Sequence, residues 1–387
     1  MKNILMIATI LMIIVAATIV ALPLAFISVL FITPNMHYII PLLIAIYVIL
    51  VVLILFKTIG WTKYPNGKKA FYGVAALIAV VALSFTASGI YKQNLDRLED
   101  TEVNLQQYSP FASGTKAMKL DEPATLKLES DLPIIDGATA LYPMYAGFAQ
   151  AVYPEKEYNL YNSEVMSNMT NVAYEKLIDG EVDLIFVAGP SSTQLASAER
   201  AGKELTLTPI GKEAFVFFVN AKNPVKTLTM NEIKGIYSGE ITNWKDVGGK
   251  KKAIRAFQRP QDSGSQTALQ NLMGDVSIMD PPVENVIDLM GGIIDEVSDY
   301  TNYSNALGFT FRYYSTEMVT NDKIRLLQIE GIEPSSETIQ SEDYPLTADI
   351  YAVTAGSDNP HIEKFIDWIL SDQGQAIIEK TGYVTNR

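Results

Sequence analysis

The chain has 387 residues, of which 48% are hydrophobic, and a formal net charge of −13. It contains no cysteine, which excludes disulfides, thiolate metal sites, cysteine nucleophiles and a lipid attached to cysteine. Six lysines are the only formal charges of the first 95 residues, so residues 96–387 carry −19. An acidic body of this kind disfavours nucleic acid as a partner.

Three apolar segments, residues 4–32, 38–56 and 70–90, open the chain. A helix needs roughly 20 residues to span a bilayer, which the first segment exceeds and the other two match. A signal peptide is the alternative interpretation of the first segment, but its apolar core is too long and no small-residue cleavage site follows. The connecting loop 57–69 holds four lysines and no acid, so the positive-inside rule places it and the N-terminus in the cytoplasm. Three transmembrane helices would then carry everything after residue 91 to the outside.

Residues 91–130 are polar and mixed, which is typical of a tether, and from Leu132 the pattern alternates between strands and helices. Apolar runs predict buried strands, and amphipathic runs with capping residues predict helices. The expected strands cover residues 133–137, 182–188, 214–220, 306–311 and 346–353, and the main expected helices cover residues 140–148, 171–179, 266–273 and 361–375. The pattern predicts an α/β body outside the membrane.

The segment 257–269 combines a cation with a hydroxyl-glycine-hydroxyl triplet directly before a helix. The first N–H groups of a helix lack intrahelical partners and attract anions. Gly264 allows a close approach of the backbone, Ser263 and Ser265 add hydroxyl donors, and Arg259 adds a guanidinium that matches an oxyanion. Taken alone, the same residues also fit an ordinary serine-capped helix with a surface arginine.

Two other helices begin with a hydroxyl residue. Thr139 precedes the helix 140–148, and Thr170 is the expected cap of the helix 171–179, which Gly180 ends. Either start has a structural explanation by itself. Three such starts together with Arg259 favour a site for an oxyanion.

Five motifs give the region 132–387 a resemblance to the phosphate-binding subunits of phosphate ABC transporters. They are Asp136–Thr139, Ser238–Trp244, Gln258–Pro260 with Ser263–Ser265, Gly308–Phe309 with Phe311, and Thr381–Tyr383. The resemblance implies a type II periplasmic-binding-protein-like fold with two α/β lobes that hold phosphate between them. Carried over residue by residue, it implies ligand contacts from Thr139, Ala140, Thr170, Arg259, Ser263, Gly264 and Ser265.

The chain departs from that family at two acidic positions and in its anchor. Ala188 stands where family members can place an aspartate that accepts a proton from phosphate, and Gln261 stands where an acid is common. Asp262, the residue after Gln261, is a candidate for the acceptor that these two positions lack. Without an acceptor, a preference for phosphate over sulfate is not implied. Gram-positive relatives often carry a lipidated cysteine, and here the three spans would replace it in the cell membrane.

These observations predict an anchor at residues 1–90, a tether at 91–130 and a solute-binding domain at 131–387. The expected first lobe comprises residues 132–218 and 309–387, and the expected second lobe comprises residues 223–303. The resemblance implies delivery of phosphate to an ABC permease in the lipid bilayer, without catalysis, metal or cofactor. A sensor that signals through the spans, a binder of sulfate and a surface hydrolase that uses Ser263 are the alternatives.

Overall fold

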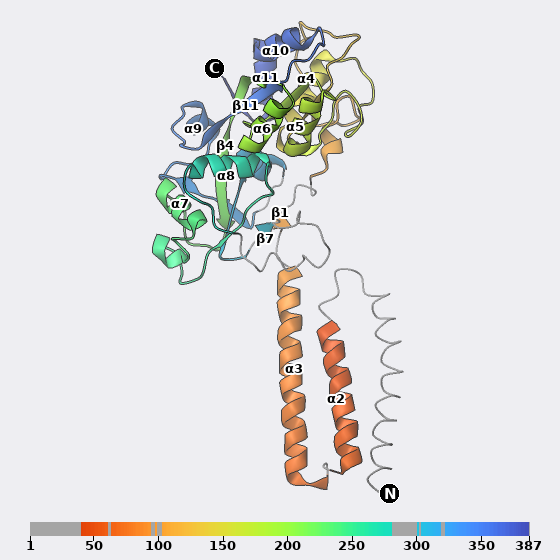
Figure 1. Cartoon of the computed structure of the whole chain (residues 1–387), viewed down its shortest axis with the longest axis vertical. Helices are drawn as coiled ribbons and strands as arrows, with labels where there is room; N and C mark the ends of the chain where they lie inside the picture. Colours follow the sequence, from red (N-terminus) through yellow and green to blue (C-terminus); the bar gives the residue numbers. More distant parts are fainter. Residues whose placement is uncertain are drawn as a thin grey trace. The chain divides into compact units, whose positions relative to one another are not determined.

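The computed structural model describes residues 40–60, 63–93, 97–98, 103–280, 300–301, 303–318 and 322–386. The first expected span, residues 4–32, lies outside these residues. The chain divides into two compact units, residues 1–95 and residues 96–387, and each is considered by itself (Figure 1).

Two helices make up the described part of the first unit. They are α2 (Ile40–Ile59) and α3 (Pro65–Gln93), which lie side by side. Pro65 occupies the first position of α3, where its missing N–H costs nothing. Within the described residues, Pro65–Ser88 is long and apolar enough to cross a membrane, and Ile44–Lys57 is a shorter apolar helix. One qualifying helix is weaker support for a membrane anchor than the three expected spans.

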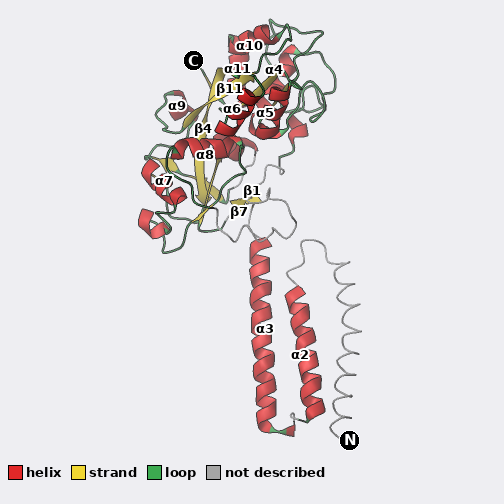
Figure 2. Ribbon diagram, in the orientation of Figure 1, coloured by secondary structure: helices red, strands yellow, loops and turns green. Residues whose placement is uncertain are grey.

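The second unit mixes helices and strands (Figure 2). Its longer helices are α4 (Tyr142–Val152), α5 (Met169–Asp179), α6 (Ser192–Arg200), α7 (Met230–Ser238), α8 (Gly264–Met273), α9 (Ser336–Gln340), α10 (Ile362–Leu370) and α11 (Asp372–Thr381). Short helical turns lie at η4 (Leu105–Tyr108), η5 (Thr139–Leu141), η6 (Trp244–Val247) and η10 (Tyr314–Met318).

The main sheet has the strand order β2-β3-β11-β4-β8-β6, and β12 and β9 also pair with β4. Its strands are β2 (Ile135–Gly137), β3 (Leu184–Val187), β4 (Thr206–Asn220), β6 (Arg255–Ala256), β8 (Ala306–Phe311), β9 (Ile324–Leu326), β11 (Thr347–Thr354) and β12 (Val384–Thr385). Two small pairings complete the strands: β1 (Arg97–Leu98) with β7 (Tyr300–Thr301), and β5 (Thr227–Leu228) with β10 (Gln328–Ile329).

Strand β4 connects two parts of this sheet. Its first half, through Ala214, pairs antiparallel with β11, whereas Phe215–Val219 pair antiparallel with β8. Because one continuous strand belongs to both parts, a small change in its backbone can move one part against the other.

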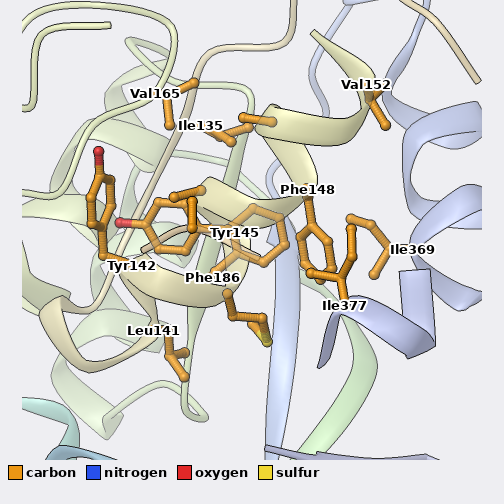
Figure 3. Packing of buried hydrophobic residues seen from close by; sticks show 14 of the residues in the cluster. Ile135, Leu141, Tyr142, Tyr145, Phe148, Val152, Val165, Phe186, Ile369 and Ile377 are labelled. Atoms are coloured by element: carbon orange, nitrogen blue, oxygen red, sulfur yellow. The ribbon is translucent and has the colours of Figure 1, made fainter. Parts of the chain in front are cut away.

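Each part of the sheet has its own hydrophobic core. In the first, the buried side chains of Tyr145 and Phe148 on α4 lie against Phe186 of β3, with Ile377 of α11 close by (Figure 3). In the second, Phe217 and Phe309 pack against Tyr237 of α7. Two cores joined by shared strands make this a two-domain α/β fold.

The two cores do not follow the expected lobe boundaries in detail. Leu327, Ile329 and Ile339, which the sequence analysis places in the first lobe, are buried in the second core. Residues 103–130, treated there as a tether, place Leu105, Tyr108, Ala117 and Leu128 in the first core. The polar composition of this segment conceals these few apolar contacts.

The single helix expected over residues 361–375 is wrong, because the chain forms α10 and α11 there. Ser371 has an extended backbone between them, with φ −71° and ψ 171°. A Cβ on Gly374 would lie 2.2 Å from the carbonyl oxygen of Ile369, so this tight turn requires glycine. The apolar periodicity continues across the break and therefore does not reveal it.

Candidate functional site

All seven candidate ligand residues line one cavity of about 330 Å³. They come from three stretches of chain that lie far apart in the sequence, residues 139–140, residue 170 and residues 259–265. The cavity is lined by Ala138, Thr139, Ala140, Leu141, Met169, Thr170, Asn171, Ala188, Glu213, Arg259, Pro260, Gln261, Ser263, Gly264, Ser265, Thr310, Phe311, Tyr314, Asp349, Ile350 and Tyr383. The fold thus brings together the three hydroxyl-headed segments that the sequence analysis singles out.

The start of α8 supplies the first wall. Ser263 is the N-cap residue, and its Oγ accepts a hydrogen bond from Gln266 N at 3.3 Å. Gln266 is buried and its Oε1 accepts from Arg259 N at 2.9 Å, which fixes the loop before the helix. Gly264 and Ser265 occupy the first turn, where backbone N–H groups lack helical acceptors and the helix dipole is positive. This arrangement favours an anion.

Gly264 lies opposite Thr170 of α5 and close to Phe311 of β8 and Ala188, which follows β3. A Cβ built on it would lie 3.4 Å from Thr170 Oγ1, 3.7 Å from Phe311 Cε2 and 3.9 Å from the Ala188 Cβ. The hydroxyl of Thr170 and the start of α8 therefore face each other across a narrow space. The missing side chain leaves that space open next to the N–H groups of the helix.

The second wall is the turn from β2 into η5 and α4, which contains Thr139 and Ala140. Ala138 N donates to Phe186 O at 2.9 Å, which fixes the turn on β3. On the other side, the hydroxyl of Tyr383 donates to Ala140 O. Tyr383 also lines the cavity, so the C-terminal motif holds the start of this helix in place.

Asp136 connects this turn to the segment before α5. Its Oδ1 accepts from Gly137 N at 2.7 Å and Asn168 N at 2.8 Å, and its Oδ2 accepts from Asn168 Nδ2 at 2.7 Å. Burial raises the pKa of the Asp136 carboxyl above its usual value, and these hydrogen bonds partly offset that effect. Asp136 belongs to the motif Asp136–Thr139, but no pattern in the sequence indicates this positioning role.

Thr170 is not the helix cap that was expected. Helix α5 begins at Met169, with Asn168 at the N-cap position and no side-chain capping hydrogen bond. Met169 has a φ of +66°, which turns the chain sharply into the helix. Thr170 is buried in the first turn of α5 and still lines the cavity, and Gly180 ends the helix as expected.

Among the residues that the structure describes as lining the cavity, Arg259 is the one lysine or arginine. Glu213 and Asp349 provide the carboxylates of the same lining. Glu213 is buried and forms an ion pair with Arg312. Burial raises the pKa of Glu213, while Arg312 and two backbone N–H groups oppose that increase. Neither carboxylate in the cavity was predicted, because both lie on long strands without a recognisable motif.

The two expected departures also lie at the cavity. Ala188 and Gln261 line it, so the positions where acids were expected carry none. Asp262 does not line it. Its Oδ1 accepts from Ser191 Oγ at 2.7 Å, at the start of α6, so this carboxylate is directed to another partner.

Curated relatives match part of this chain at low identity. The phosphate-binding protein PstS of Bacillus subtilis is 24% identical over 254 residues, which cover 65% of this chain and 79% of that protein. PstS of Borreliella burgdorferi is 25% identical over 233 residues, which cover 57% and 81%. A solved structure from Clostridium perfringens, described as a putative phosphate ABC transporter substrate-binding protein with bound phosphate, is 23% identical with a TM-score of 0.47. It covers 65% of this chain and 98% of that one.

The comparison with family models covers most of the second unit. Residues 131–373 match the model described as a PBP superfamily domain, and the match includes all the candidate ligand residues. The two-core α/β architecture and the cavity with its helix starts agree with that assignment. The chain therefore belongs to the PBP superfamily.

Proposed function

We propose that the second unit binds a tetrahedral oxyanion, inorganic phosphate first among the candidates, and delivers it to an ABC permease. The observation that carries this proposal is the convergence of Thr139, Thr170 and the Arg259 to Ser265 segment on one cavity. Neutral donors with a single guanidinium suit a ligand that is compact and negatively charged. Relatives named phosphate-binding proteins support phosphate as that ligand.

In this proposal, Arg259 provides the counter-charge and the helix starts provide the remaining donors. The backbone N–H groups near Ala140 and Gly264 approach the anion from opposite sides, and the hydroxyls of Thr139, Thr170, Ser263 and Ser265 complete the shell. The site binds without chemical change. It therefore requires no nucleophile, metal or cofactor.

The anchor of this protein is part of the same proposal. Three spans within residues 1–90, with the N-terminus in the cytoplasm, would hold the binding domain outside a Gram-positive cell. Helix α3, the apolar part of α2 and the four lysines of residues 57–69, at and between the facing ends of these helices, support this topology. A fixed anchor would keep the binding domain beside a permease in the same membrane.

The movement that captures the ligand involves β4, the end of β8 and the start of β11. We place the two lobes on the two hydrophobic cores, with residues 215–280, 303–311 and 324–346 in the second. Gly264 already lies close to Thr170, so entry and release of the anion would require the two lobes to move apart at this point. In this proposal the chain crosses between the lobes nearer to Glu213 and Arg312 than the expected lobe ranges imply, which leave the crossings between residues 218 and 223 and between residues 303 and 309.

Isothermal titration of the detergent-solubilised full chain with phosphate tests this function. We expect saturable binding of phosphate at one site per chain, and no comparable heat with chloride. Absence of phosphate binding by a folded protein would refute the proposed ligand.

A further inference from the structure

The ligand segment, residues 259–265 of the second lobe, contacts the first lobe at a point outside the cavity. Asp262 lies in this segment, directly before the N-cap of α8, and faces the start of α6, which lies beside α5 in the first lobe. Asp262 Oδ1 accepts from Ser191 Oγ at 2.7 Å, and Asp262 O accepts from Gln194 Nε2 at 3.2 Å. These three residues form a latch that connects the lobes and does not line the cavity.

The half of the latch that belongs to the first lobe is fixed by the start of α6 itself. Ser191 is the N-cap residue, and its Oγ accepts from Gln194 N at 3.1 Å. Gln194 Oε1 accepts from Ser191 N at 2.8 Å, which completes a capping box. Ser191 is 3% exposed and Gln194 6% exposed. The box therefore holds a hydroxyl and an amide donor toward Asp262, where the positive end of the helix dipole also favours a carboxylate.

The backbone of Asp262 has an unusual conformation. Its φ is +64°, in the left-handed region that glycine adopts freely and that aspartate and asparagine tolerate better than most residues. The turn is closed by Ser263 N, which donates to Pro260 O at 3.2 Å and leaves Asp262 at its third position. Glycine would adopt this turn without strain, so the hydrogen bond of the carboxylate to the other lobe indicates a role for the side chain.

The latch can form only while the two lobes are close together. Entry and release of an anion require the lobes to separate where Gly264 faces Thr170. The hydrogen bonds of the latch must therefore break before the anion leaves, whereas the open form that takes up the anion lacks them.

We propose that Asp262 is a positioning residue, which holds the ligand segment against the first lobe and thereby slows the release of the bound oxyanion. It acts through the closure of the lobes and does not contact the ligand. This inference rests on the proposed function of the cavity.

The test compares the release of phosphate from the parent and from Asp262→Gly, which removes the carboxylate and suits the positive φ. Calorimetry of the full chain in detergent gives the affinity, and the exchange of bound radiolabelled phosphate for unlabelled phosphate gives the release rate. Because a hydrogen bond to a charged group is lost, release should be at least ~10-fold faster and affinity at least ~10-fold weaker, with little change in the association rate. Asp262→Asn keeps an oxygen acceptor without the charge, so its release rate should lie between those of the parent and Asp262→Gly.

Two further variants separate the latch from a local effect on the turn. Asp131→Gly makes the same change at an exposed aspartate of the first lobe that has a φ of +49° and does not line the cavity, so it should release phosphate as the parent does. Ser191→Gly removes the donor of the latch at small cost to the helix, because glycine is an acceptable N-cap residue. Since Ser191→Gly and Asp262→Gly remove the same hydrogen bond, the double variant should release phosphate about as fast as Asp262→Gly alone.

The outcomes separate this inference from the proposed function. A folded parent that binds no phosphate contradicts the proposed function and the role of the latch with it. A parent that binds phosphate, with the same release rate in Asp262→Gly, overturns the latch alone. The latch is also overturned if the effects of Ser191→Gly and Asp262→Gly multiply in the double variant, because they would then not share a bond. Thermal melting without phosphate establishes that each variant is folded.

Discussion

One added methyl group at Gly264 should weaken the binding of phosphate without lowering the stability of the fold. In Gly264→Ala the new Cβ would sit in ordinary contact with Thr170, Phe311 and Ala188, beside the N–H groups of α8. Alanine is favoured over glycine in helices by up to about 1 kcal/mol, so the unliganded protein should be at least as stable as the parent.

The ligand, however, would lose its close approach to the helix start in Gly264→Ala. One hydrogen bond to a charged group contributes about 1.5–3 kcal/mol, so affinity for phosphate should fall at least ~10-fold. Calorimetry and thermal melting of the same preparation measure both quantities. Unchanged affinity in a stable variant would show that the anion does not approach this backbone.

Asp136 should make the stability of the folded protein depend on pH, in a direction that its raised pKa determines. Its folded pKa is raised, so the folded state binds a proton more readily than the unfolded state, and stability increases as the pH falls through the raised pKa toward the ordinary value of about 3.9. Asp136→Asn lacks this contribution. The melting temperature of the parent, relative to that of the variant, should therefore rise as the pH is lowered through the raised pKa to about 3.9.

The exposed neighbour variant Asp131→Asn is the control for the Asp136 experiment. It should follow the parent across the same range. A constant difference between the parent and Asp136→Asn at all pH values would contradict the raised pKa.

At the scale of elements, the junction of β4 and β8 depends on a buried ion pair. Arg312 approaches Glu213 and also donates from Nη2 to Gly382 O at 2.6 Å. Breaking a buried pair leaves an uncompensated charge, so Arg312→Leu should lower the free energy of unfolding by on the order of 3 kcal/mol. Urea unfolding followed by circular dichroism measures this change.

Lys212 offers the matched control for that junction, since it lies next to Glu213 on β4 and pairs with the exposed Glu342. Surface pairs contribute about 0–1 kcal/mol, so Lys212→Met should have a small effect. Equal losses in Arg312→Leu and Lys212→Met would contradict the importance of the buried pair.

Helices and strands can be predicted from the sequence where an apolar run or a capping residue marks them within one short stretch. The strand runs ending at Val187 and Phe311, and the helix after Ser263, follow from apolar runs and a cap. The break at Ser371 was missed because the apolar face continues through it. The long extension of β4 back to Thr206 was missed because that half alternates with polar residues.

The sequence predicts the part of the candidate site that lies at helix starts. The helix starts carry hydroxyls in recognisable positions, and the cavity gathers all of them. Glu213, Asp349 and the hydroxyl of Tyr383 reach the same cavity through pairing between distant strands and through the packing of the C-terminus. No local pattern contains that information.

For the whole molecule, the topology can be tested in cells. If the N-terminus and the basic loop 57–69 are cytoplasmic, protease added outside intact cells should release a soluble fragment of roughly 285–294 residues by cutting after the last span. Residues 103–130 pack on the first core, so the cut should fall before them. A protected second unit would contradict the extracytoplasmic location.

The central claim is that Arg259 and the three helix starts together bind phosphate. Calorimetric titration of the full chain and of Arg259→Ala with phosphate tests it most directly, because this substitution removes the cation among the residues described as lining the cavity. Charge-assisted hydrogen bonds are about twice as strong as neutral ones, so affinity should fall at least ~10-fold while the melting temperature stays near that of the parent. Equal phosphate affinity in the parent and in Arg259→Ala would show that the segment before α8 is only a helix cap.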